Sequence, residues 1–385
     1  MIKRSFFEAF SQTLSKSLNH ALLMENLTDF PKKNKFRRLH EGESKKMKIL
    51  FIGGTGNISE AVSKLVIERG HELFLLNRCQ TPHSISGIQT IQTDISSVLQ
   101  VEKALGHMSF DVIADFIAFT PDDVKRDIQL FRKITKQYVF VSSAVVYEKN
   151  RIFTPIRECS PHANPNWDYA AKKIECEKIL MDAWENEHFP VTIVRPSHTY
   201  DKMIPVAIGK GYDLIDRMRK GNRVIIHDSG NSLWTMTHST DFAKGFVGLL
   251  GNPVTIGEAF HITSDEHLSW NQIYRIIADA AGVTDFNAVH IPGEFIQRLE
   301  PDWGPTITCD KGFSAIFDNS KIKRYVPGFE CTTPFFTGFR NTLKRYDSGE
   351  LSKEIDNSIS HKLDNMIQTW TDFMDQVEKA YRILK

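Results

Sequence analysis

The sequence predicts an α/β protein with a doubly wound parallel sheet. Short apolar segments at 47–52, 111–116, 138–142 and 191–194 are typical of buried strands. Helical periodicity fills the stretches between them, and a glycine-rich turn joins the first strand to the first helix. Strands that alternate with helices in this way predict a parallel sheet with helices on both faces.

The first strand–helix–strand unit is Met47–Leu76. The apolar segment Met47–Ile52 predicts the first strand. Apolar residues then recur every three or four positions over Ile58–Glu68, which predicts a helix. Gly70 ends this helix, and Leu73–Leu76 is expected to be the second strand.

After Pro196 the alternation weakens, and we expect a smaller lobe there. A helix over Thr240–Leu250 and a strand at Ala259–Thr263 restore the regular pattern. Leu351–Leu384 has apolar residues three or four apart and is expected to be a helical tail. Two interpretations of this tail stay open: it docks on its own domain, or it forms a homodimer contact.

Composition excludes several classes of protein. The 385 residues carry 48 Lys+Arg and 47 Asp+Glu, and this balance disfavours a dedicated nucleic-acid binder. No run of about 18 apolar residues exists, so no membrane-spanning helix is expected. Five scattered cysteines without a Cys-x-x-Cys predict reduced thiols in a cytoplasmic protein. The absence of His-Glu-x-x-His and Gly-x-Ser-x-Gly disfavours a metal site and a hydrolase.

Residues 1–46 form a basic extension with 10 Lys/Arg against 5 Asp/Glu, including the run Pro31–Arg38. Met47 is itself a plausible start. The extension has three interpretations: a flexible leader, an organelle-targeting segment, or a surface for an anionic partner.

The turn Gly53-Gly54-Thr55-Gly56-Asn57-Ile58-Ser59 is expected to bind a dinucleotide. Small residues let the backbone approach a pyrophosphate, and the N–H groups at the helix start favour an anion. The residues expected to contact the cofactor here are Gly53, Thr55, Gly56, Asn57 and Ile58.

The end of the second strand indicates which cofactor is bound. An acidic residue there would bind the ribose hydroxyls of NAD, but the sequence has Asn77-Arg78. A guanidinium can pair with a 2′-phosphate, which favours NADP, although Arg78 could instead stack on adenine or face solvent. Asp94 and Ile95 are expected on the adenine side, and Asp94 could equally cap the next helix.

Tyr169 and Lys173 are four residues apart at the start of an expected helix, so they share one face. The Lys173 ammonium and a positive nicotinamide ring would lower the pKa of Tyr169, which is about 10 when free. Tyr169 could then act as a general base. Ser143, with Ser142 as the adjacent candidate, ends a buried strand and could orient a substrate oxygen.

These motifs together resemble the extended short-chain dehydrogenase/reductases, which include the NAD(P)-dependent sugar epimerases, dehydratases and reductases. The resemblance runs from about Met47 to about Tyr346 and includes Val194-Arg195-Pro196 and His238–Ala243. It implies a Rossmann-type fold and a catalytic triad of Ser143, Tyr169 and Lys173. The implied divisions are an extension (1–46), a dinucleotide-binding domain (47–196 and 236–263), a substrate lobe (197–235 and 264–333) and a helical tail (334–385).

Three departures from the family pattern bear on function. Ser59 stands where the third glycine is usual, and Ala144-Val145 replaces the Asp-Glu pair of 4,6-dehydratases. Trp234 lies about where nucleotide-sugar epimerases have an arginine on the diphosphate, which weakens the case for a nucleotide sugar. The stretch before His238 also resembles chloroplast stem-loop RNA-binding relatives of the epimerases.

Two functions therefore compete. The first is an NAD(P)-dependent oxidoreductase or epimerase that acts on a carbinol of a small sugar-like substrate. The second is a catalytically weak binding protein that acts on RNA or as a regulator. The Ser-Tyr-Lys set favours the enzyme. The expected wall of the substrate site is Ser197, His198, Tyr200 and Trp234, and His238 is expected to begin a helix.

Overall fold

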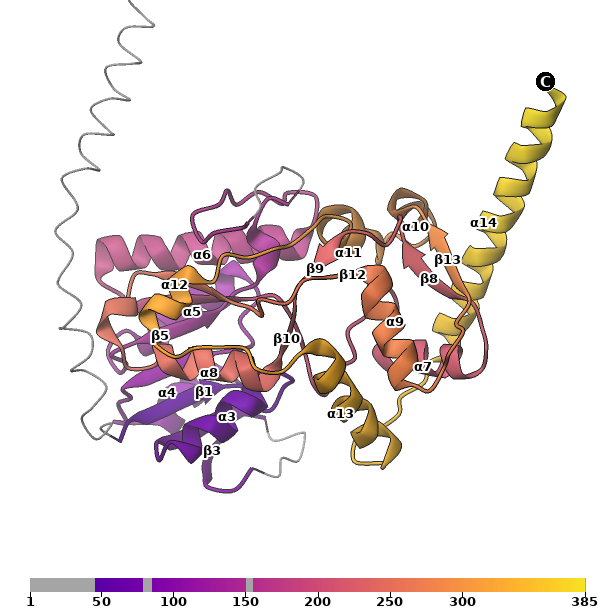
Figure 1. The fold of residues 1–385 in the computed structure, drawn as a ribbon. Coiled ribbons are helices and arrows are strands. Elements are labelled where there is room, and N and C mark those ends of the chain that lie inside the picture. Colours follow the sequence, from indigo (N-terminus) through magenta and orange to yellow (C-terminus); the bar gives the residue numbers. More distant parts are fainter. Residues whose placement is uncertain (1–45, 79–84, 150–154, 385) are drawn as a thin grey trace, which may run out of the picture. The chain divides into compact units, whose positions relative to one another are not determined.

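The computed structural model describes residues 46–78, 85–149 and 155–384, so the interpretations of residues 1–45 lie outside it. The chain divides into a unit of residues 1–46 and a unit of residues 47–385, and the fold below is that of the second unit. Among the described residues, seven parallel strands form one sheet in the order β11-β6-β5-β4-β1-β2-β3 (Figure 1). The predicted parallel α/β fold is confirmed.

The sheet and its covering helices use the following segments. The strands are β1 Lys48–Ile52, β2 Glu72–Asn77, β3 Ile88–Gln92, β4 Val112–Asp115, β5 Tyr138–Val141, β6 Val191–Pro196 and β11 Ala259–Ile262. The helices are α3 Ser59–Glu68, α4 Val98–Leu105, α5 Pro121–Phe131, α6 Asp168–Glu187 and α8 Ser239–Leu249, with the short helical turns η1 Ala144–Val146 and η2 Pro253–Thr255.

Alternate side chains of β1 enter two separate cores because successive residues of a strand face opposite sides of the sheet. Ile49 and Phe51 pack with residues of α3 and α8, and Leu50 and Ile52 pack with residues of α4, α5 and α6. Figure 1 shows α3 and α8 on one face and α5 and α6 on the other. This two-sided burial explains why β1 is apolar throughout instead of alternating.

The remaining segments form the second part of this unit. Its strands are β7 His198–Tyr200, β8 Val224–His227, β9 Leu233–Trp234, β10 Met236–His238, β12 Leu268–Ser269 and β13 Ala288–Ile291, which pair as β10-β7, β12-β9 and β13-β8. Its helices are α7 Gly211–Arg219, α9 Trp270–Ala280, α10 Gly293–Leu299, α11 Gly304–Thr306, α12 Ser320–Tyr325, α13 Phe335–Asp347 and α14 Asn357–Ile383, with the π-helical turn η3 Ile307–Lys311. The division into domains stays a prediction.

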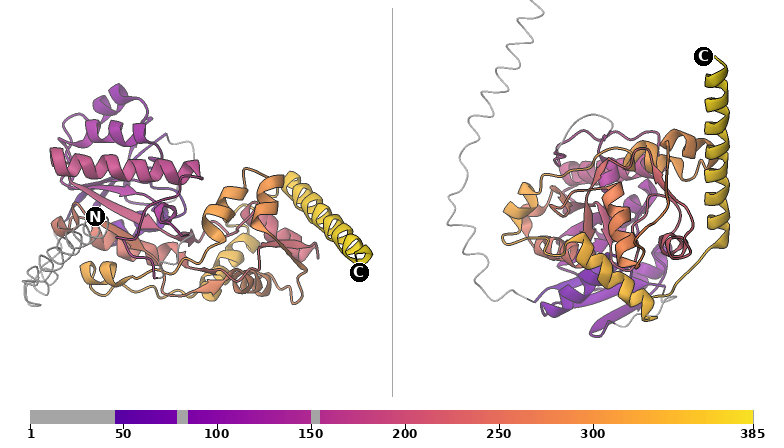
Figure 2. Two further views of the ribbon diagram at one scale, coloured as in Figure 1. Left: turned by 90° about the horizontal axis from the view of Figure 1, so that it is seen from above. Right: turned by 45° about the vertical axis from the view of Figure 1, so that its right-hand side comes forward.

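Helix α14 begins at Asn357 rather than at Leu351, because the Asp356 carboxylate caps it by accepting a hydrogen bond from the Ser358 amide. Its first half packs on the chain's own core through Ile359, Leu363, Met366 and Ile367. Its second half extends away from the rest of the unit, with Phe373, Met374 and Val377 about half exposed (Figures 1 and 2). The alternative interpretation, a homodimer contact, stays a prediction. In the part of the chain that the structure describes, no helix is long and apolar enough to cross a membrane.

Candidate active site and cofactor cleft

The turn after β1 can be formed only with glycine at its start. Gly53 and Gly54 have φ values of +92° and +102°, a region that side chains disfavour. A Cβ on Gly54 would lie 2.5 Å from Leu75 Cδ2, so the turn lies directly against β2. Ser59, in place of a third glycine, is buried, and its Oγ accepts a hydrogen bond from the Gly56 amide at 2.9 Å. This close approach of bare backbone to the sheet fits a pyrophosphate site.

Asn57 connects this turn to the segment after β7. Its Nδ2 donates to the carbonyl of Thr199 at 3.3 Å, and its Oδ1 accepts from the amide of Met203 at 3.2 Å. Lys202 in the same segment also forms an ion pair with Glu60 of α3. The Asn57 side chain therefore holds the glycine turn in place, and Ile58 caps the start of α3.

The residues expected to read the adenosine half of a dinucleotide lie around one cavity of about 380 Å³. Its walls include Thr55, Asn77, Arg78, Asp94, Ile95 and Arg126. Asp94 does not cap α4, whose N-cap residue is Ser97. Hydrogen bonds from the amide and hydroxyl of Ser96 hold the pKa of Asp94 below its ordinary value.

Arg126 is a second cation of this cavity that the sequence analysis missed. Its guanidinium is bound by Asp127, at 2.8 and 3.0 Å, and by Asp123 at 2.9 Å. The motif Thr120-Pro121-Asp122-Asp123 contained a signal for this position, since Thr120 and Asp123 form the capping box of α5. That box predicts where α5 begins, and Arg126 lies one turn further along.

Asp115, at the end of β4, organises the loop beside the glycine turn. Its Oδ1 accepts hydrogen bonds from the amides of Ile117 and Ala118 at 2.6 and 2.7 Å. Complete burial, reinforced by the neighbouring Asp127 carboxylate, raises the pKa of Asp115 well above its ordinary value. We infer that Asp115 is protonated near neutral pH. Asp127 also accepts from the Tyr138 hydroxyl at 2.6 Å.

Lys173 is buried beneath the loop that Asp115 fixes. Its Nζ donates to the carbonyls of Ala118 and Val141 at 2.8 and 2.9 Å and lies 4.6 Å from the ring centre of Phe119. Burial lowers the pKa of Lys173 to about 8. Two backbone carbonyls therefore orient this ammonium from below, and its third hydrogen stays available.

Tyr169 and Ser143 line a second cavity, of about 200 Å³. Burial raises the pKa of Tyr169, the nearby Asp310 raises it further, and the Ser143 side chain acts in the opposite direction. This direction differs from the lowered pKa that the Tyr-Lys spacing predicts, because burial outweighs the local charges. A lowering by the positive nicotinamide ring stays a prediction. Ser143 Oγ accepts from the Val145 amide at 3.3 Å.

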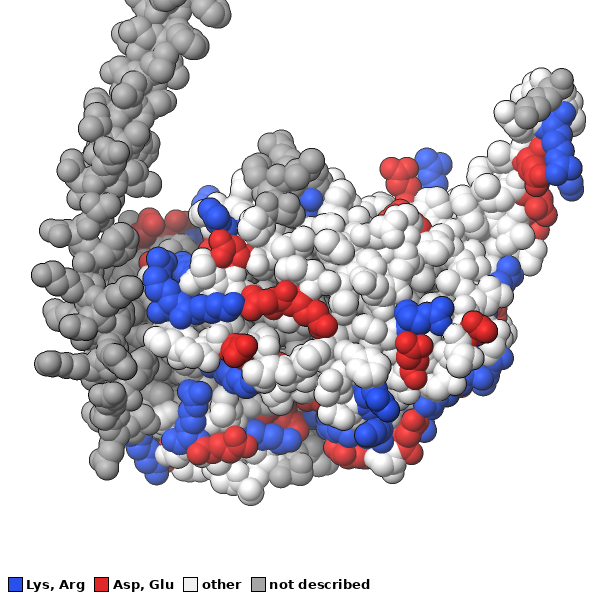
Figure 3. Space-filling model, viewed as in Figure 1, with Lys and Arg blue, Asp and Glu red and all other residues white. Residues whose placement is uncertain are grey.

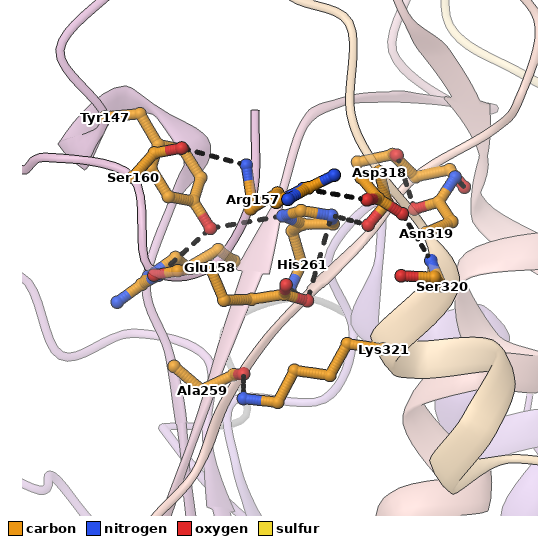
Figure 4. A network of polar contacts seen from close by, with 12 residues as sticks. Tyr147, Arg157, Glu158, Ser160, Ala259, His261, Asp318, Asn319, Ser320 and Lys321 are labelled. Atoms are coloured by element: carbon orange, nitrogen blue, oxygen red, sulfur yellow. Dashed lines mark hydrogen bonds and ion pairs between the residues drawn. The ribbon is translucent and has the colours of Figure 1, made fainter. Parts of the chain in front are cut away.

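The adjacent serine and the family landmarks beyond it take structural positions. Ser142 Oγ is buried and makes no hydrogen bond to the described residues. Tyr147 and Arg195 belong to a buried network in which the Tyr147 hydroxyl lies 3.0 Å from Arg195 Nη1 and 3.2 Å from His261 Nδ1 (Figure 4). Arg195 also pairs with both carboxylate oxygens of Glu177, at 2.9 and 2.6 Å. These landmarks lock β6 and α6 together.

The four residues expected to form the substrate wall separate into two sets. Ser197, His198 and Trp234 line the cavity of Tyr169. Tyr200 is fully buried between Phe335 and His238, with ring centres 5.0 and 5.1 Å away, and lies outside this cavity. His238 caps the start of α8, as expected.

Three charged residues of this cavity were missed: Lys149, Asp310 and Lys311. Asp310 and Lys311 lie in η3, an irregular segment whose place in the fold has no periodicity to reveal it. Lys149 follows the Ser-Ser-Ala-Val-Val-Tyr motif by only two residues, which was the available signal.

Comparisons with curated proteins give two relatives. The chain is 25% identical over 272 residues to the chloroplast stem-loop binding protein of 41 kDa b from Arabidopsis thaliana, covering 67% of this chain and 69% of that protein. It is 28% identical over 161 residues to the UDP-glucose 4-epimerase of Lactobacillus helveticus. This match spans 37% of the chain and about half, 48%, of the epimerase.

Solved structures share the fold. An epimerase from Methanothermobacter thermautotrophicus superposes with a TM-score of 0.67 at 14% identity, covering 80% of this chain and 94% of that one. The UDP-glucose 4-epimerase of Thermus thermophilus, solved in complex with NAD, gives a TM-score of 0.62 at 16% identity, covering 78% and 99%. The family model for the NAD dependent epimerase/dehydratase family matches residues 49–263, more than half of the sequence. The chain is thus a member of the NAD dependent epimerase/dehydratase family.

Proposed function

We propose that this protein is an NAD(P)-dependent oxidoreductase or epimerase that acts on a carbinol of a sugar-like substrate. One observation carries the proposal: Tyr169 and Ser143 line the same cavity, and Lys173 is fixed one helical turn from Tyr169. A binding protein has no need of a buried lysine oriented beside a tyrosine at the end of a parallel sheet. Such edges are where ligands bind in this architecture.

Each of the three residues has a role that its position supports. Ser143 donates a hydrogen bond to the substrate oxygen and orients the hydroxyl toward Tyr169. Tyr169 accepts the hydroxyl proton as general base. Lys173 stabilises the tyrosinate and binds the nicotinamide ribose with its remaining hydrogen. When bound, the nicotinamide ring supplies the hydride acceptor.

The cofactor is proposed to be NADP(H) in preference to NAD(H). Arg78 and Arg126 both line the cavity next to the end of β2, and Asn77 replaces the acidic residue that would bind a free ribose 2′-hydroxyl. Asp94 in the same cavity is already occupied by Ser96. A 2′-phosphate would meet one exposed guanidinium, that of Arg78.

The cofactor that co-purifies with the full chain tests this proposal. Mass spectrometry of the denatured protein identifies it, and titration with NAD⁺, NADH and NADPH gives the affinities. A retained NAD⁺ supports an epimerase, since an epimerase keeps its cofactor through the cycle. An empty site that binds NADPH supports a reductase. Binding of none of these dinucleotides would refute both.

The second candidate, an RNA-binding protein, is favoured by one observation, the match to the chloroplast stem-loop binding protein. The net charge of +1 argues against it, and Lys/Arg and Asp/Glu side chains are interspersed on the face in Figure 3. Filter binding of a stem-loop RNA at increasing salt distinguishes the two. Affinity that survives physiological salt and is lost with neither cofactor nor Tyr169 would favour the RNA-binding protein.

A further inference from the structure

Two ammonium groups and one carboxylate lie in the cavity that also holds Tyr169 and Ser143. Lys149 and Asp310 form an ion pair whose side chains are 2% and 4% exposed. Lys311 is next to Asp310 in the sequence, and its side chain is 13% exposed. All three belong to the wall of a cavity of about 200 Å³, which suits a group of monosaccharide size.

The charges in this cluster do not balance. Asp310 is bound by Lys149, whereas the Lys311 Nζ lies 3.8 Å from Asp310 Oδ2, beyond hydrogen-bond distance. Within the described ranges, no hydrogen bond is made by the Lys311 ammonium. The other ionisable groups of the wall are neutral near pH 7: burial and the two lysines lower the pKa of His198 to about 3, and burial raises that of Tyr169. One positive charge is therefore left over.

The backbone around Lys311 is held firmly. Its carbonyl accepts a hydrogen bond from Ser232 Oγ at 2.9 Å and lies 3.1 Å from His227 Nε2. The Asn164 Nδ2 donates to the carbonyls of Cys309 and Val145, at 3.0 and 3.2 Å. Asn164 thereby ties the segment of Asp310 and Lys311 to the turn that follows Ser143. The ammonium is thus positioned relative to the proposed catalytic residues.

A desolvated ammonium without a hydrogen-bonding partner is costly, and a bound anion would remove that cost. We propose that Lys311, supported by the Lys149–Asp310 pair, binds an oxyanion carried by the sugar-like substrate itself, such as a carboxylate or a phosphate. This inference rests on the proposed function, since it assigns the substrate class of the same cavity. Asp310 orients Lys149 and keeps the site at a net charge of +1, which suits an anionic ring substituent.

Binding in the cofactor-loaded full chain tests the inference without requiring turnover. The probes are glucuronate, glucose 6-phosphate and neutral glucose, each titrated by tryptophan fluorescence, because Trp234 lines the cavity. At least one charged sugar is expected to bind about tenfold or more tightly than glucose, the worth of a charged hydrogen bond. The better of the two identifies the oxyanion as a carboxylate or a phosphate. Equal affinity for all three would overturn the inference.

Three variants locate the effect. Lys311→Met should weaken the charged sugar by about tenfold or more and leave glucose unchanged, and Lys311→Arg should retain much of the preference. Lys103→Met, an exposed lysine of α4, is the matched control. Undiminished preference in Lys311→Met would contradict the proposal. If that variant fails to fold, the salt dependence of the wild-type preference decides, since an unscreened, salt-independent preference would also contradict it.

This result is separable from the fate of the proposed function. Tyr169→Phe should bind the charged sugar as tightly as the wild type does, because the anion contacts Lys311 and not the phenol. Anion binding without any hydride transfer would leave this inference standing and refute the proposed chemistry. Turnover of neutral sugars at full efficiency would do the reverse.

Discussion

The Lys173 ammonium donates a hydrogen bond to the carbonyl of Ala118, 2.8 Å away, and Asp115 holds the amide of the same residue at 2.7 Å. The end of β4 therefore orients the proposed catalytic lysine through one peptide. This relationship gives Asp115 a positioning role. That role depends on the carboxyl being protonated beside Asp127.

Substitution of Asp115 tests its protonation state. Asp115→Asn should be tolerated, because the amide reproduces a protonated carboxyl that accepts from the loop and donates toward Asp127. Asp115→Val leaves two buried amides without acceptors and should lower the free energy of unfolding by about 2–4 kcal/mol. Urea denaturation measures both. An Asn variant as unstable as the Val variant would show that Asp115 is ionised.

Gly54→Ala should abolish most cofactor binding. The added Cβ meets Leu75 at 2.5 Å in a backbone with φ of +102°, so the turn must shift. Gly106→Ala is the control, because its φ is also positive, at +54°, but no atom lies within 4 Å of the new Cβ. Both variants carry strain and only the first carries a clash. Isothermal titration with NADPH should therefore show a loss for Gly54→Ala alone, and equal losses would count against the steric argument.

Stability should fall in mild acid through His261. Burial lowers the pKa of this histidine to about 4, below the roughly 6.5 expected when it is unfolded. The unfolded chain then binds the proton first, so His261 contributes stability above about pH 6.5 that is lost as pH falls toward 4. The loss is about 1.4 kcal/mol per pH unit, or roughly 3 kcal/mol in all.

His261→Gln should flatten this slope by one proton, measured by urea denaturation between pH 7 and 4. His107→Gln, at an exposed histidine, should leave the slope unchanged. A wild-type slope in His261→Gln would mean that His261 titrates alike in the folded and unfolded chains.

Arg78 is expected to select the cofactor. Arg78→Ala should weaken NADPH binding by about tenfold or more, the worth of a charge-assisted hydrogen bond, and change NADH binding little. Fluorescence titration with both cofactors measures the selectivity. The proposal fails if the wild-type protein binds NADH as tightly as NADPH.

The sequence predicts the parts of the fold that depend on local periodicity. β1, α3 and β6 were predicted to within about two residues because their burial on both faces or on one stripe leaves a clear pattern. β3 was missed because it lies at the edge of the sheet with a mostly exposed Ile88–Gln92. The start of α14 was placed too early, since the capping Asp356 lies within a longer apolar repeat.

The site divides in the same way. Motif positions such as Gly53, Ser143 and Tyr169 could be named from the chain alone, because their spacing along one strand–helix unit reflects their spacing in space. Lys149, Asp310 and Lys311 could not, because tertiary contacts across 161 residues bring them together. Tyr200 shows the converse error, an aromatic expected at the substrate that instead fills the core.

The rate of hydride transfer in Tyr169→Phe tests the central proposal most directly. Transfer is followed by the absorbance of the reduced nicotinamide in a single turnover of cofactor-loaded protein, with Ser143→Ala and Lys173→Ala alongside. Tyr169→Phe should lose about 10²–10⁴ in rate with cofactor affinity intact, since the general base is gone but the pyrophosphate turn is untouched. Ser143→Ala should mainly lose rate, and Lys173→Ala should lose both rate and affinity. A Tyr169→Phe protein that transfers hydride at the wild-type rate would contradict the account.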